Sequence, residues 1–318
     1  MTIIDLLLLA ILSLIWGASF LFIKVTVLEM SPVALAAFRL TLGTIGLVIL
    51  TAGSGLLGGG ISKAPRKPAR GILPRRLLLP SVVLALFGAV FPYMLIAWGE
   101  LHVASGAAAI LNATSPLFSA LFSRWRVLWG QEEELSLGRV AGLLVGLLGV
   151  VVLVTGSRGF HVLGSGGLLE MAGFGAVIAA SASYAIGGLF ARRAFAGEPF
   201  TLPALGQNLA GTVLLLPLAL TVARPAGWPS PAALGSVLAL GLGGTALAYL
   251  VYYYLLSRVG ATRTLSVTYL LPATALVYGA VLLGEEITLA MIGGLALILA
   301  GITLVSGLFL LRWQGTPR

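Results

Sequence analysis

Cysteine is absent from this 318-residue sequence, and only two histidines are present. Without cysteine the chain can form no disulfide, offer no thiol nucleophile and ligate no metal through sulfur. The histidines, His102 and His161, are too far apart in sequence to give a metal-ligand spacing. We therefore expect no metal site, no cofactor and no catalytic residues, and the protein is not expected to be an enzyme.

Charged side chains are also scarce. Asp, Glu, Lys and Arg together make up 9% of the residues, whereas about 25% is typical of soluble domains. Hydrophobic residues make up 59%, and the mean hydropathy is +1.07. So few charges could not cover a water-facing surface. These values favour lipid as the solvent over the alternative of a soluble chain with a very large core.

The apolar residues form ten runs that are each long enough to cross a bilayer, which needs about 20 residues. The runs are 3–23, 33–52, 77–99, 104–123, 138–156, 166–190, 203–222, 232–256, 264–283 and 289–311. A cleaved signal peptide is not expected, because no basic residue precedes the first run and Trp16 stands where a small-residue cleavage site would lie. The sequence predicts an all-α membrane protein with ten transmembrane helices.

The net charge of +9 is explained by topology, and no nucleic acid partner is expected. If the N-terminus is cytoplasmic, fifteen of the nineteen Lys and Arg residues fall on the cytoplasmic side, as the positive-inside rule requires. We therefore predict that both termini are cytoplasmic. The basic loop 53–74 is interpreted as a topology determinant, with contact to anionic lipid as the alternative.

The two halves of the sequence resemble each other. The stretch 141–156 reads AGLLVGLLGVVVLVTG, and the stretch 292–307 reads IGGLALILAGITLVSG. Upstream, Pro116 corresponds to Pro272, and Gly88 to Gly244. This order predicts two repeats of five helices, over 1–156 and 165–312. An odd number of helices per repeat gives the second half inverted topology, with a binding site at the repeat interface near the midplane.

Several motifs together resemble a known family. They are Trp16-Gly17-Ala18-Ser19-Phe20, Lys24, Pro32, Arg39, Ala104-Ser105-Gly106-Ala107-Ala108, Ser115-Pro116-Leu117-Phe118, Thr245-Ala246-Leu247-Ala248-Tyr249, Val259-Gly260-Ala261, Tyr269-Leu270-Leu271-Pro272 and Gly284-Glu285. In this order and spacing, the chain resembles the EamA-type, ten-helix transporters of the drug/metabolite transporter superfamily. The resemblance covers about residues 5–312.

The resemblance implies export of small metabolites, often amino acids or related compounds, across the inner membrane of a bacterium. No GxxxxGK[ST] motif is present, so we expect gradients to drive transport by alternating access. A lipid-carrier flippase is the first alternative. An integral-membrane lipid-processing enzyme is a weaker one, because His/acid clusters are scarce. The expected partners are a small-molecule substrate and the bilayer, and a homodimer is left open.

Polar and aromatic side chains recur at helical spacing along six of the predicted helices, so each set falls on one face. In lipid such faces turn inward, either as contacts between helices or as the walls of a cavity. The predicted substrate-binding residues are Trp16, Ser19, Phe20, Arg39, Tyr93, Asn112, Ser115, Tyr184, Thr245, Tyr249 and Thr268.

Two charged residues are candidates for coupling. Arg39 lies within the second predicted helix, and Glu100 lies at the end of the third. Ionisable groups inside a membrane are costly and are therefore often functional. Glu100 could carry a proton or pair with Arg39. Snorkelling of Arg39 to the headgroups, and an interfacial place for Glu100, are the structural alternatives.

Overall fold

The computed structural model describes residues 2–53, 73–122, 137–156, 167–199, 201–223, 227–259 and 267–305. These residues are almost entirely helical and include no strand. The basic loop interpreted as a topology determinant lies mostly outside the described residues. The all-helical fold predicted from the hydropathy is confirmed.

The helices follow the predicted runs closely. The first half contains α1 (Ile3–Val27), α2 (Pro32–Gly53), η1 (Arg75–Leu77), α4 (Leu78–Ala85), η2 (Leu86–Val90), α5 (Phe91–Glu100), α6 (Ser105–Asn112), α7 (Ser115–Phe122) and α9 (Leu137–Thr155). The second half contains α10 (Gly167–Ala194), α11 (Thr201–Thr221), α12 (Pro231–Leu238), η3 (Ala239–Leu247), α13 (Ala248–Val259), α15 (Val267–Leu283) and α16 (Leu289–Val305). Joined end to end, these elements give eight spans long and apolar enough to cross a membrane, and two shorter apolar helices.

Four of the predicted runs are interrupted or extended. The first helix continues to Val27, so Lys24 lies inside α1 and not after it. The run 104–123 is divided at Ala113 and Thr114 into α6 and α7, next to Pro116. The third and eighth spans each contain a π-helical stretch, η2 and η3. Such stretches are frequent at functional sites.

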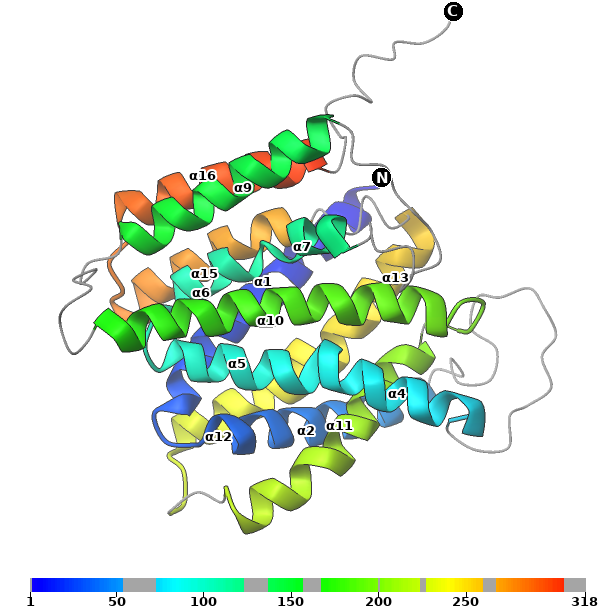
Figure 1. Ribbon diagram of the computed structural model, residues 1–318. Helices are drawn as coiled ribbons and strands as arrows, with labels where there is room; N and C mark the ends of the chain where they lie inside the picture. Colours follow the sequence, from blue (N-terminus) through cyan, green and yellow to red (C-terminus); the bar gives the residue numbers. More distant parts are fainter. Residues whose placement is uncertain are drawn as a thin grey trace, which may run out of the picture.

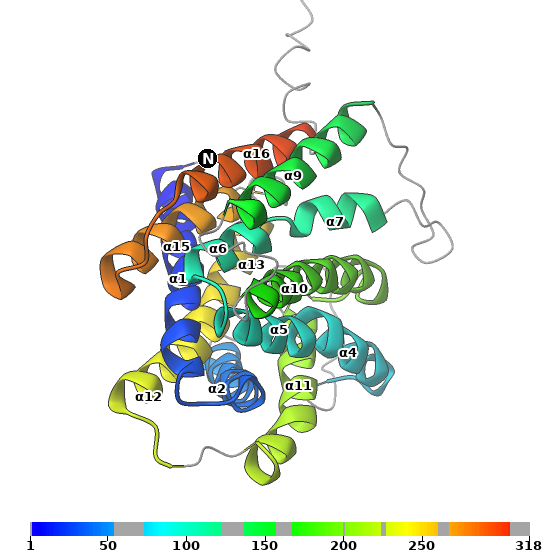
Figure 2. The same cartoon turned by 60° about the vertical axis from the view of Figure 1, so that its left-hand side comes forward.

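The contacts between the two halves occur in matched sets: a contact between two helices recurs between their counterparts when the halves are exchanged. The span α9 packs along α16, and α2 packs along α11 (Figures 1 and 2). The contact of α1 with α15 is matched by that of α10 with α6 and α7. In Figure 1, α1 begins at the right and α10, the first helix of the second half, begins at the left. Equivalent helices of the two halves therefore run in opposite directions.

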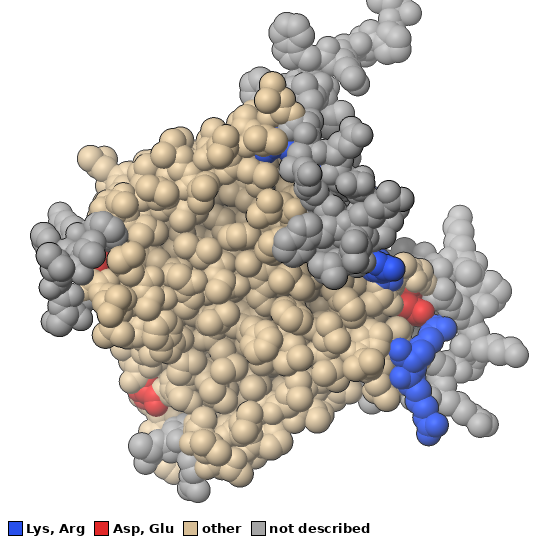
Figure 3. All heavy atoms as spheres, in the orientation of Figure 1, with Lys and Arg blue, Asp and Glu red and all other residues tan. Residues whose placement is uncertain are grey.

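On the outer face of the bundle, the described charged residues lie toward its two ends. The middle of the face in Figure 3 shows no charged atoms, and exposed side chains such as Leu144, Val213 and Val281 are apolar. Six arginines lie at helix ends on the side where α1 begins, which we call the arginine-rich end: Arg75, Arg76, Arg139, Arg192, Arg193 and Arg258. The opposite end carries the α1–α2, α5–α6 and α15–α16 loops. The apolar band identifies a multi-pass membrane protein.

Candidate functional site

A cavity of about 610 Å³ lies between the two halves. Its walls come from α1, α2, α5, α6, α7 and α9 of the first half and from α10, η3, α13, α15 and α16 of the second. The lining residues are Trp16, Ser19, Phe20, Arg39, Tyr93, Asn112, Ala113, Ser115, Pro116, Ser119, Ala120, Arg139, Tyr184, Ala185, Gly188, Leu189, Arg192, Gly244, Tyr249, Thr268, Leu271, Ile302 and Val305.

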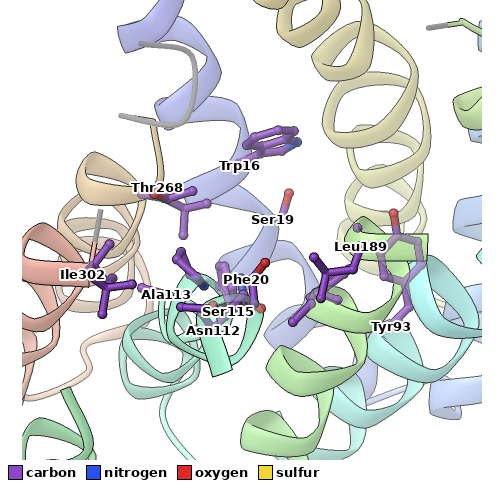
Figure 4. Close-up of a pocket in the computed structure, with 18 of the residues that line it drawn as sticks. Trp16, Ser19, Phe20, Tyr93, Asn112, Ala113, Ser115, Leu189, Thr268 and Ile302 are labelled. Carbon is purple, nitrogen blue, oxygen red and sulfur yellow. Dashed lines mark hydrogen bonds between the residues drawn. The ribbon is translucent and has the colours of Figure 1, made fainter. Parts of the chain in front are cut away.

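Ten of the eleven residues predicted to bind substrate line this cavity. Figure 4 labels several of them on different sides of one space, with Trp16 and Phe20 from α1, Tyr93 from α5 and Thr268 from α15. The exception is Thr245, which is fully buried behind the wall. Binding by these residues stays a prediction, but the structure brings them together around one cavity.

The aromatic part of the wall is held in place across the two halves. The indole of Trp16 donates from Nε1 to the carbonyl oxygen of Gly244 at 3.2 Å. Gly244 lies in the π-helical stretch η3, where the usual backbone bonding register is interrupted. The Trp16 ring also lies 5.6 Å from that of Tyr252. In the same wall, the Tyr249 hydroxyl accepts a hydrogen bond from Gln207 at 2.8 Å.

Arg39 lies deep in the cavity wall and is only 7% exposed. Its Nε donates to Thr245 Oγ1 at 3.2 Å, and its guanidinium carbon stands 4.0 Å from the centre of the Tyr93 ring. Cations over aromatic faces are attracted by the ring quadrupole. These contacts hold the side chain inside the bundle, so the alternative that Arg39 snorkels to the headgroups is not the arrangement in this structure.

Asn112 offers a buried acceptor in the same wall. Its Oδ1 atom has no hydrogen-bond partner among the described residues. Asn112 is the last residue of α6, and its backbone carbonyl accepts from Ser115 Oγ at 2.8 Å across the break before α7. Buried polar groups are normally paired. Asn112 therefore carries an unpaired buried acceptor in a residue that lines the cavity.

Glu100 is separate from the cavity. Its side chain is fully buried at the end of α5, and neither carboxylate oxygen has a hydrogen-bond partner in the described part of the chain. The predicted pairing of Glu100 with Arg39 is therefore not made in this structure. Next to it, the Lys24 ammonium donates to the backbone carbonyls of Glu100 and, at 2.9 Å, of Val103. A carboxylate and an ammonium thus lie close together inside the protein without a direct ion pair.

The described lining of the cavity extends to the arginine-rich end. Ser119, Arg139, Arg192 and Val305 lie near that end, and no lining residue that the structure describes belongs to the loops of the opposite end. At the opposite end the Glu285 carboxylate accepts from the backbone N–H and hydroxyl of Ser105, both at 2.8 Å, and from Gly106 N–H at 3.2 Å. These bonds join the second half to the N-terminus of α6.

A second polar contact joins the halves at the same opposite end. The Glu29 carboxylate accepts from the hydroxyl and the backbone N–H of Ser230, both at 2.6 Å. These two hydrogen bonds hold the pKa of the Glu29 carboxyl below its ordinary value. The opposite end is therefore closed by contacts between the halves.

Two kinds of lining residue are not predicted by the sequence. Arg139 and Arg192 fit the positive-inside pattern as topology charges, yet they line the cavity near its mouth. Ile302 and Val305 belong to an apolar run with no polar stripe, so no signal separates them from lipid-facing neighbours. Across the described lining the charged residues are arginines, and none is acidic.

Comparison with known proteins gives a consistent result. The model of the EamA-like transporter family matches residues 3–155 and 171–307. An uncharacterized transporter of Archaeoglobus fulgidus is 28% identical over 91% of this chain and 94% of its own length. A probable terminal-alkyne amino-acid exporter of Streptantibioticus cattleyicolor is 29% identical over 92% of this chain and 89% of its own length.

Two further similarities concern location and fold. YedA, an uncharacterized inner membrane transporter of Escherichia coli strain K12, is 29% identical over 90% of this chain and 84% of its own length. A crystal structure with 21% sequence identity matches with a TM-score of 0.65 and covers 98% of this chain and 99% of that chain. This structural match supports the fold alone.

Proposed function

This chain belongs to the EamA-like transporter family, and we propose that it exports small metabolites, with amino acids or related compounds first, by alternating access. The observation that carries the proposal is the cavity of about 610 Å³ between the halves, whose described lining extends to one end of the bundle and not to the other. Transporters built from inverted repeats bind their substrates at such an interface and expose it to each side in turn.

The chemistry of the cavity supports an amphipathic substrate. Trp16, Phe20 and Tyr249 provide apolar surface, and Asn112, Ser19 and Ser115 add polar side chains to the same lining. The relative from Streptantibioticus cattleyicolor is named as a probable amino-acid exporter, which supports the same substrate class. The resemblance of the two chains covers nearly their full lengths.

The direction of transport rests on the charge distribution. Six described arginines lie at one end of the bundle, and the positive-inside rule favours a cytoplasmic place for that end. The cavity in this structure would then face the cytoplasm, as loading of an exported substrate requires. A bacterial inner membrane location is supported by the name of the Escherichia coli relative, and both termini would be cytoplasmic.

Coupling to a proton gradient is assigned to Glu100 in this proposal. A buried carboxylate without hydrogen-bond partners among the described residues is costly to keep ionised, so its charge can change with its surroundings as the two ends open and close. Lys24 and Arg39 are the nearby cations, and Glu285 is the nearby acid.

The test is transport with two cavity variants and a matched control. Trp16→Ala and Tyr249→Ala should reduce amino-acid transport into proteoliposomes about tenfold or more, because each removes wall area and a hydrogen bond that fixes the wall. Trp228→Ala is the control, since Trp228 is 96% exposed and far from the lining. Wild-type protein that is folded and transports no amino acid or related compound would contradict the proposal.

A further inference from the structure

Among the described residues, Arg39 is a buried cation without a bound anionic partner. Charged groups inside a membrane protein are normally paired or face a functional cavity. The described contacts of Arg39 are the neutral hydroxyl of Thr245 and the ring of Tyr93. Neither is an anion, so this side chain is held in position without a hydrogen-bonded negative partner among the described residues. The buried Glu100 interacts with its charge only through space.

Glu100 is an acidic residue close enough to interact with the charge of Arg39, but it makes no direct bond to the guanidinium. The carboxylate oxygens of Glu100 are buried without any hydrogen-bond partner among the described residues, so they make no bond to the guanidinium. The cavity lining adds Arg139 and Arg192 and no acidic residue from the described chain. The described lining therefore offers Arg39 no anion of its own.

The two terminal nitrogens of the Arg39 guanidinium make no hydrogen bond to the described residues, so they are available to a ligand. The Nε atom is used by Thr245, while Nη2 lies close to Gly244, where an added Cβ would stand 3.9 Å from it. Gly244 lines the cavity and carries no side chain. The same added Cβ would lie 2.9 Å from Ser19 Oγ. Gly244 thus allows the backbone of η3 to approach Ser19 closely, and Arg39, Ser19 and Gly244 all line the cavity.

We propose that the part of the cavity lined by Arg39, Ser19 and Gly244 is a carboxylate subsite, in which the substrate supplies a hydrogen-bonded anion to Arg39. The inference rests on the proposed transport function and narrows its substrate class to molecules with a carboxylate group. A planar guanidinium matches a carboxylate through two parallel hydrogen bonds. Cationic and neutral metabolites of similar size would leave Arg39 unpaired and would bind poorly.

The experiment measures ligand binding to purified protein by thermal shift and tryptophan fluorescence. The probes are the twenty amino acids, with leucine and phenylalanine each accompanied by the deaminated acid, the decarboxylated amine and the amino alcohol. We expect the acids to bind about tenfold or more tightly than the matched amines and alcohols, since a hydrogen-bonded charge pair is lost in the latter.

Variants assign the effect to this residue. Arg39→Gln should weaken binding of every carboxylate by about tenfold or more and leave the weak amine binding unchanged. Arg39→Lys keeps the charge but not the fork, and should fall between wild type and Arg39→Gln. Arg75→Gln is the matched control, because Arg75 is exposed outside the cavity, and it should bind like wild type.

Three results would overturn the subsite: no carboxylate in the panel binds, the amines bind as tightly as the acids, or Arg39→Gln binds carboxylates like wild type. The comparison of acids with amines on wild-type protein decides the matter even if Arg39→Gln does not fold. If cationic metabolites are transported, and at the same rate by Arg39→Lys as by wild type, the carboxylate subsite is wrong but the proposed export function stands. Absence of all transport would instead remove the proposed function.

Discussion

Glu285 shows how one side chain can close one end of a membrane bundle. Its carboxylate receives three hydrogen bonds from Ser105 and Gly106 at the start of α6. A negative charge is favoured at a helix N-terminus by the unpaired N–H groups and the helix dipole. Gly284, with a φ of 67°, makes the turn that directs Glu285 toward α6. The closure therefore depends on a charge and not on apolar packing alone.

We predict that Glu285→Gln lowers the free energy of unfolding by about 1–3 kcal/mol, because the amide cannot accept from all the donors that face it. Thermal unfolding in detergent, together with hydrogen exchange at the start of α6, would measure the change. Glu286→Gln is the neighbouring control, since it removes the same charge from the next residue of the same loop. Equal unfolding of the two variants would show that Glu285 has no special role at this end.

Glu100 leads to a prediction about coupling. Glu100→Gln is nearly isosteric and removes no described hydrogen bond of the carboxylate, so the variant should fold. If the proposed coupling holds, it should still transport substrate down its concentration gradient but lose the stimulation by an imposed pH gradient. Proteoliposomes with a clamped membrane potential allow this comparison. Glu170→Gln is the control, and a pH response equal to wild type in Glu100→Gln would exclude this carboxylate.

At the scale of elements, the helices α9 and α16 pack backbone to backbone. A Cβ on Gly301 would lie 2.6 Å from both the carbonyl oxygen of Gly142 and the nitrogen of Gly146. A Cβ on Gly293, in the same helix, would meet nothing nearer than 3.8 Å. Small residues allow such close approach in lipid, where association depends on packing.

Gly301→Ala should therefore destabilise the fold by about 1–3 kcal/mol, because backbone atoms cannot move aside for the methyl group. Gly293→Ala should cost little and serves as the control on the same helix. Thermal unfolding of both variants would measure the difference. If the two alanine variants unfold alike, the close contact between α9 and α16 does not limit stability.

The two π-helical stretches have equivalent places in the two halves. Each has a backbone carbonyl that accepts from the other half: Gly244 from Trp16 at 3.2 Å, and Phe87 from Ser183 at 2.8 Å. Matching Gly88 with Gly244 in the sequence predicts the correspondence of these positions but not their conformation. A π turn forms when the backbone hydrogen bonds shift by one residue along the helix. No residue type in these runs predicts that shift.

At the scale of the whole molecule, the spans can be predicted from the sequence, and so can part of the lining of the cavity. Run length and hydropathy locate a helix because lipid requires about 20 apolar residues. Stripes such as Asn112 and Ser115 turn inward because polar atoms avoid lipid. Thr245 also turns inward, yet it meets Arg39 instead of the cavity. Sequence periodicity predicts that a side chain points into the bundle. Whether it reaches the cavity or stays behind the wall depends on how the helices cross.

Orientation can be tested directly because the chain has no cysteine of its own. Ala196 lies exposed at the arginine-rich end, and Trp228 lies 96% exposed near the opposite end. In intact cells, an impermeant thiol reagent should label Trp228→Cys and should label Ala196→Cys only after permeabilisation. Labelling of Ala196→Cys from outside would reverse the orientation and turn the cavity of this structure away from the cytoplasm.

A carboxylate subsite at Arg39 would have a consequence for the kinetics of the proposed transport cycle. To return empty, the protein would enclose the guanidinium without a hydrogen-bonded anion, which costs free energy that the loaded protein does not spend. The empty return would then be the slow step, and a substrate molecule on the far side would speed it by making the return loaded. Such a carrier would exchange solutes faster than it moves them in one direction, and the unloaded state would limit its net flux.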